Sequence, residues 1–177
     1  GKRIAFVFDP NAEKRLDHFH AIAELSVRDT SVQRLAMDKA WDFTAPRYSP
    51  DGGSVAFVAS HQGKKVTMPG HLAVVHRGAR WRVLSAAWDH AVNPPLRSSS
   101  PDASHVYFTA EERGRCHLYA WSVAGANATA VVNGGWVQGF DVAAGVAVTV
   151  ADSMQHPARV SAWRDGAVPL RIESFTD

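Results

Sequence analysis

The chain has 177 residues, of which 46% are hydrophobic and 20% charged, and its formal net charge is +2. This length is enough to bury a core, and the composition is typical of one globular domain, not of a disordered segment. The weak positive charge lies in no basic block and no apolar run reaches the ~20 residues of a membrane helix, so neither nucleic acid nor a membrane is an expected partner.

The first predicted strands lie close to the amino terminus. Residues 2–8, which end in Ile-Ala-Phe-Val-Phe, match the strand that follows the turn in later copies of the repeat, and residues 20–25 and 32–35 are predicted to be the next strands. Ala, Glu, Lys and Leu gather between residues 11 and 25, where residues 13–17 have a weak helical pattern, but we interpret this stretch as a long hairpin loop. Because strand-like sequence follows Gly1 so directly, we expect the chain to be a piece of a longer polypeptide.

The second group of strands begins with a distinctive turn, Ser49-Pro50-Asp51-Gly52. Proline presets φ for a turn, aspartate bonds to nearby amides, and glycine accepts positive φ. Residues 54–59 then read as a strand, so the motif predicts a hairpin turn. Further strands are predicted at residues 71–75 and 81–84.

The turn recurs further along the chain. Ser100-Pro101-Asp102 lies 51 residues after the first copy and precedes a strand at residues 104–110. A weaker copy at residues 140–145 precedes residues 146–150. Four short strands in each 40–50 residues are typical of a β-propeller blade. The remaining predicted strands are residues 117–123, 128–132, 159–163 and 170–172.

The repeats predict an all-β fold, a partial β-propeller of about four four-stranded antiparallel blades in one domain. The expected blades are about residues 1–40, 41–88, 89–135 and 136–177. Each blade packs an apolar face on the next, and closing a ring removes the open edges. Because four blades are few for a closed ring, we expect exposed blade faces and self-association, with two copies forming a ring of about eight blades.

Trp41, Trp88 and Trp136 each precede a copy of the repeat by a similar distance. Their recurrence favours packing between blades, with stacking on a ligand as the alternative. If Trp136 is buried in this way, its replacement by alanine removes about 3–5 kcal/mol of stability.

Several segments resemble the propeller of serine peptidases of the prolyl oligopeptidase family, most of all the acylaminoacyl-peptidase and dipeptidyl-peptidase-like branch. These segments are residues 45–52, residues 107–119 with an acidic-Arg-Gly turn before His117-Leu118-Tyr119, and residues 172–177. The resemblance implies a propeller that caps an α/β-hydrolase domain with a Ser-Asp-His triad and limits access to peptides. That hydrolase domain is absent from the chain, which has no Gly-x-Ser-x-Gly motif, so no catalytic residue is assigned.

The residues singled out for binding are Glu111, Glu112 and Arg113, because some members of the family hold a substrate's amino group with an acidic pair on the propeller. The alternative is a solvated turn with local ion pairs worth at most ~1 kcal/mol. His18 and His20 have a spacing compatible with a metal, but the sequence lacks a metal-binding motif, and no metal or cofactor is expected. The single cysteine, Cys116, is expected to be a small strand residue.

Two functions remain open at this stage. The first is a non-catalytic propeller that gates peptide access to a hydrolase domain, whose partners are that domain and the peptide substrates. The alternative is a protein-binding propeller of the TolB type, since TolB-like propellers also carry Ser-Pro-Asp-Gly repeats. The single cysteine favours the cytoplasm, with the periplasm as the alternative.

Overall fold

The computed structural model describes residues 1–13, 18–63, 68–98, 103–125, 127–164 and 170–174. Every regular element in these ranges is a β-strand. No described segment forms a helix with the length and apolar character required to cross a membrane. The chain divides into two compact units, Gly1–Leu96 and Arg97–Asp177, which are described separately.

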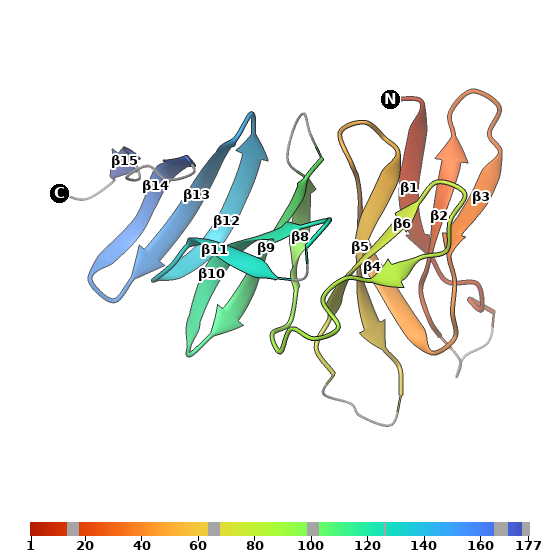
Figure 1. The fold of residues 1–177 in the computed structure, drawn as a ribbon, viewed down its shortest axis with the longest axis horizontal. Helices are drawn as coiled ribbons and strands as arrows, with labels where there is room; N and C mark the ends of the chain where they lie inside the picture. The colour runs from red at the N-terminus through yellow and green to blue at the C-terminus, as the bar shows by residue number, and fades with distance from the viewer. Residues whose placement is uncertain (14–17, 64–67, 99–102, 126, 165–169, 175–177) are drawn as a thin grey trace. The chain divides into compact units, whose positions relative to one another are not determined.

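The first unit contains two antiparallel sheets (Figure 1). The first sheet has the order β1-β2-β3 and the second the order β4-β5-β6-β7. Their strands are β1 (Arg3–Phe8), β2 (Ala21–Ser26), β3 (Val32–Ala36), β4 (Trp41–Tyr48), β5 (Ser54–His61), β6 (His71–His76) and β7 (Arg82–Val83).

These two sheets share one hydrophobic core. Ile22 of the first sheet packs with Phe43 and Phe57 of the second, and all three are fully buried. The rings of Phe43 and Phe57 meet edge to face with centroids 5.3 Å apart, and Trp81 lies 4.9 Å from Phe43. Edge-to-face contacts of this kind are favourable for aromatic pairs. Because Ile22 packs against these rings, the core joins the two sheets face to face.

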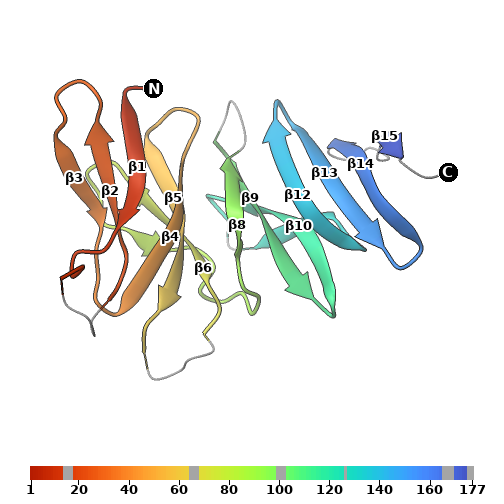
Figure 2. The same cartoon turned by 180° about the vertical axis from the view of Figure 1, so that it is seen from behind.

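The second unit contains two meanders of four strands (Figure 2). The first consists of β8 (Asn93–Ser98), β9 (His105–Glu112), β10 (Arg115–Ser122) and β11 (Ala128–Val132), and β8 begins before the unit boundary. The second consists of β12 (Trp136–Ala143), β13 (Val146–Ser153), β14 (His156–Arg164) and β15 (Leu170–Ser174). Leu118, Val132 and Phe140 belong to the core between them.

One bridge connects the two meanders of the second unit. Cys116 of β10 pairs in parallel with Trp136 of β12, and the Cys116 amide donates to the Gly135 carbonyl at 3.3 Å. This single bridge places all eight strands in one hydrogen-bonded sheet, while each meander keeps its four antiparallel strands. The first sheet has three strands.

The hairpin predicted at Ser49-Pro50-Asp51-Gly52 is confirmed. The Ser49 amide donates to the Ser54 carbonyl at 2.9 Å, and the Gly52 amide donates to the Ser49 carbonyl at 2.8 Å. The Asp51 carboxylate accepts the Gly53 amide at 3.0 Å and the Ser49 hydroxyl. Gly52 has φ 68°, the left-handed conformation for which glycine is favoured.

The second copy of the turn is described only at its end. Ser100, Pro101 and Asp102 lie outside the described residues, as do residues 14–17, which belong to the stretch with the weak helical pattern. Ala103 lies 51 positions after Gly52 and has φ 55°. The repeat therefore keeps the left-handed backbone at this position although the glycine has been replaced.

Exchanging residues between these two positions should change stability in opposite directions. Gly52→Ala is expected to cost about 1–2 kcal/mol, the strain of a left-handed alanine, and its Cβ would lie 3.2 Å from Arg3 Nη2. Ala103→Gly is expected to gain up to about 1 kcal/mol, because the relief of strain exceeds the added entropy of the unfolded chain. Urea unfolding measures both changes, and a loss of stability in Ala103→Gly would contradict the argument.

The three repeated tryptophans occupy different environments. Trp41 is partly buried at the start of β4, with its ring 5.5 Å from Trp81. Trp88 is partly buried in the connection before β8, edge to face with His90 at 5.1 Å. Trp136 is 41% exposed, so the prediction that it is buried is wrong within this chain. It is the first residue of β12.

The buried tryptophan of the second unit is Trp121 on β10, which is 1% exposed. Trp121→Ala is expected to cost about 3–5 kcal/mol because it leaves a large cavity. Trp136→Ala is expected to cost about 1 kcal/mol, as for a residue that loses little buried area. Denaturant unfolding of the two variants compares them directly, and equal losses would show that Trp136 is packed as a core residue.

Candidate functional site

Glu111, Glu112 and Arg113 lie at the hairpin between β9 and β10. Arg113 and Gly114 form its turn with φ 51° and 73°, which is typical of a tight β-hairpin. Glu112 accepts a hydrogen bond from the Tyr119 hydroxyl at 3.0 Å and lies 3.9 Å from Arg113 Nε, while Glu111 is exposed. Consecutive strand residues point to opposite faces, so the two carboxylates do not converge on one site. This geometry favours a solvated turn, and substrate binding by these residues stays a prediction.

The two histidines with metal-like spacing have separate carboxylate partners. His18 Nδ1 contacts Asp9, and His20 Nδ1 lies 2.8 Å from Asp42. Within the described residues, no three His, Cys, Asp or Glu side chains are grouped as metal ligands. Cys116 is buried, and burial raises the pKa of its thiol, so the thiolate needed for nucleophilic chemistry is disfavoured.

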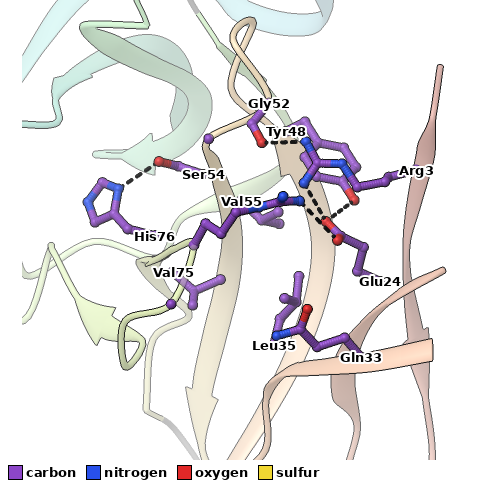
Figure 3. Close-up of a pocket in the computed structure, with 13 residues that line it drawn as sticks. Arg3, Glu24, Gln33, Leu35, Tyr48, Gly52, Ser54, Val55, Val75 and His76 are labelled. Atoms are coloured by element: carbon purple, nitrogen blue, oxygen red, sulfur yellow. Dashed lines mark hydrogen bonds and ion pairs between the residues drawn. The ribbon is translucent and has the colours of Figure 1, made fainter. Parts of the chain in front are cut away.

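The most organised group of polar side chains surrounds Glu24 on β2 (Figure 3). Glu24 is only 8% exposed. Its Oε2 lies 3.2 Å from Arg3 Nη1 and accepts the Tyr48 hydroxyl at 2.8 Å, and its Oε1 lies 3.2 Å from Arg77 Nη2. These four residues, called the Glu24 cluster below, come from β1, β2, β4 and the turn after β6.

The Glu24 cluster connects the first sheet to the Ser-Pro-Asp-Gly hairpin. Arg3 Nη2 donates to the Gly52 carbonyl at 3.0 Å, and the guanidinium carbon lies 5.7 Å from the centre of the Tyr48 ring. An isolated buried carboxylate is strongly disfavoured, and two arginines with a hydroxyl donor offset that penalty. The cluster therefore holds β1 and β2 in place over the hairpin between β4 and β5.

The small pocket beside the Glu24 cluster is also lined by Ser54 and His76. Ser54 and His76 occupy facing positions on β5 and β6, where Ser54 Oγ and His76 Nδ1 are 2.6 Å apart. Ser54 lies in a regular strand and makes a cross-strand pair, unlike a nucleophile on a strained turn. Burial, together with the hydrogen bond to Glu24, raises the pKa of Tyr48 to about 12, so its phenol stays protonated at neutral pH.

The Tyr48 phenol should make the stability of the first unit sensitive to alkali. Because its pKa in the folded state is about 12 against 10.0 for the free side chain, the protonated phenol is favoured by folding. This contribution is complete below pH 10 and is lost as the pH rises toward about 12. Phenolate absorbance gives the titration, and Tyr48→Phe should reduce the loss of stability across this window. A Tyr48 midpoint near the free value would contradict the buried contact with Glu24.

Comparison with known proteins bears on the fold. No family profile matches the sequence. No curated protein matches it either. Among solved structures, the β-propeller domain of the trilobed protease from Pyrococcus furiosus superposes with a TM-score of 0.76 at 17% identity, covering 99% of this chain and 53% of that one.

Two further structures match over 99% of this chain. Acylaminoacyl peptidase from Pyrococcus horikoshii has a TM-score of 0.75 at 19% identity, with 26% of that chain covered. TolB from Acinetobacter baumannii has a TM-score of 0.68 at 16% identity, with 42% of that chain covered. The chain therefore spans about half or less of each of these proteins.

These similarities establish the fold. The chain is an all-β partial β-propeller whose sheets are not closed, and it has the fold of propellers from peptidases of the prolyl oligopeptidase family. The predicted fold class is confirmed, and so is the predicted similarity in fold to the propellers of these peptidases. The Glu24 cluster was not predicted, because its members are spread over residues 3–77 without a local motif.

Proposed function

We propose that this chain is the non-catalytic propeller part of a serine peptidase of the prolyl oligopeptidase family, and that it gates peptide access to a hydrolase domain. The observation that carries the proposal is the match of almost the whole chain to propellers of two peptidases. The resemblance of residues 45–52 and 107–119 to the same family supports it independently.

The local chemistry agrees with a supporting role. The Glu24 cluster places its charges in contacts between the first sheet and the hairpin. The sequence contains no Gly-x-Ser-x-Gly motif, so hydrolysis would belong to the hydrolase domain. We assign the blades to about residues 1–40, 41–88, 89–135 and 136–177, and the groups of consecutive strands support this division.

A protein-binding propeller of the TolB type is the second candidate, and the match to TolB over 99% of the chain favours it. The two candidates also differ in compartment. If the chain belongs to a peptidase, we expect the protein in the cytoplasm, as predicted from the single cysteine. If it is a TolB-like propeller, we expect it in the periplasm.

The reading frame that encodes this chain distinguishes the two functions. The peptidase proposal expects a hydrolase domain with a Gly-x-Ser-x-Gly motif, followed by an aspartate and a histidine. The 177-residue chain should not cleave a chromogenic acylaminoacyl substrate above background. The longer protein should cleave it, and should hydrolyse short peptides faster than folded proteins.

The matched control is the longer protein with alanine in place of the motif serine, which should be inactive while its propeller still folds. A reading frame that contains only further Ser-Pro-Asp-Gly repeats would contradict the peptidase proposal and favour the TolB-like alternative. Turnover by the 177-residue chain itself would contradict both.

A further inference from the structure

A hollow of about 330 Å³ lies within the second unit, between residues 132–135 and residues 149–163, and we call it the Arg159 hollow. One wall is the end of β11 and the connection to β12, which includes Asn133, Gly134 and Gly135. The other wall is formed by residues of β13 and β14. This volume is in the range of pockets that bind small molecules.

The β14 wall of the hollow places polar side chains beside an apolar core. Arg159 pairs with Ala151 of β13 and Ser161 pairs with Thr149, so these four side chains point to the same side of the sheet. Ala151 and Trp163 pack against the core between the two meanders, so this side faces the first meander. Trp163 Nε1 donates to Thr149 Oγ1 at 2.8 Å. The wall therefore combines an aromatic ring, a hydroxyl and a guanidinium along one strand.

Arg159 is a partly buried cation that has no protein partner in the part of the chain that the structure describes. Its Nε is buried and makes no hydrogen bond there, and its guanidinium forms no ion pair with a described carboxylate. Arg3, Arg77 and Arg97, in contrast, each contact a carboxylate. A buried donor without a partner is unfavourable. A ligand that accepts a hydrogen bond from Arg159 Nε would remove this penalty.

The other polar groups that line the Arg159 hollow already have partners. The Asp152 carboxylate accepts a hydrogen bond from Gln138 Nε2 at 2.6 Å. His156 Nδ1 lies 2.9 Å from the Pro157 carbonyl, which can only accept, so this nitrogen is the donor. Arg159 is therefore the charged group of the lining that is left for a ligand. One guanidinium balances one negative charge, and the nearby Asp152 disfavours a dianion such as phosphate.

We propose that the Arg159 hollow binds a ligand that consists of an apolar or aromatic group ending in a carboxylate. The carboxylate would accept hydrogen bonds from the Arg159 guanidinium and the Ser161 hydroxyl, and charge-assisted bonds of this kind are the stronger ones. The apolar group would pack against Trp163, Ala151 and Val132, which line the same hollow. This inference is independent of the proposed peptidase function.

Isothermal titration calorimetry tests the proposal with the 177-residue chain, in a buffer free of carboxylates and phosphate. The probe is 3-phenylpropanoate, which joins a phenyl ring to a carboxylate. It should bind, and 3-phenylpropanamide, which has the same shape without the charge, should bind on the order of 10-fold or more weakly. No binding of the carboxylate up to millimolar concentration would overturn the proposal, unless the peptide probe described below binds.

The peptide Ser-Gly-Ser-Gly-Phe, with a free or an amidated carboxyl end, distinguishes two sources of the same chemistry. Binding of the free-ended peptide in preference to the amidated one would show that a chain end can supply the carboxylate. Binding of 3-phenylpropanoate without binding of the peptide would restrict the ligand to a free small molecule. Failure of both carboxylates to bind would leave the hollow without the proposed function.

Two arginines on β14 provide a matched pair of variants. Arg159→Gln should weaken binding of the carboxylate by on the order of 10-fold or more, because the charge and the Nε donor are lost. Arg164→Gln makes the same change at an exposed position outside the hollow, and should bind as the wild type does. Circular dichroism checks folding, and Arg159→Met replaces the glutamine variant if that variant does not fold. Equal binding by the wild type and the Arg159 variant would contradict the proposal.

Discussion

The structure depends on strands whose two faces are both apolar. Phe57 and Val58 are neighbours on β5 and point to opposite sides of the sheet, yet they are 0% and 5% exposed. Burial of both faces stabilises a sheet of this kind, because both carry apolar side chains. Stability then arises from contacts between successive sheets, as in other repeat architectures.

The Glu24 cluster is the main polar feature in this otherwise apolar arrangement. It lies at the rim of the contact between the first and second sheets, where Arg3 also reaches the Gly52 carbonyl. A buried ion pair of this kind adds little net stability, but it strongly disfavours arrangements that leave one charge alone. The cluster therefore acts on the relative placement of β1, β2 and the hairpin more than on the total free energy of folding.

The fold alone does not decide the function, because propellers of the same shape occur in peptidases and in TolB. The described residues support a scaffold whose polar groups hold sheets together. Under the proposed peptidase function, chemistry would reside outside these sheets, and the propeller would act through its shape and surfaces. A propeller with this role would need apolar side chains in its sheets but few specific polar ones. The low identity between this chain and proteins of similar fold agrees with that.

The amino-acid sequence alone was sufficient for the Ser49–Gly52 turn, most of the strands and the fold class. The Ser49–Gly52 hairpin depends on proline, aspartate and glycine acting within four residues, and strand alternation is equally local. The Glu24 cluster and the exposure of Trp136 depend on which distant segments pack together. Only the tertiary structure decided these features, because burial and ion pairing are properties of neighbours in space and no spacing along the chain encodes them.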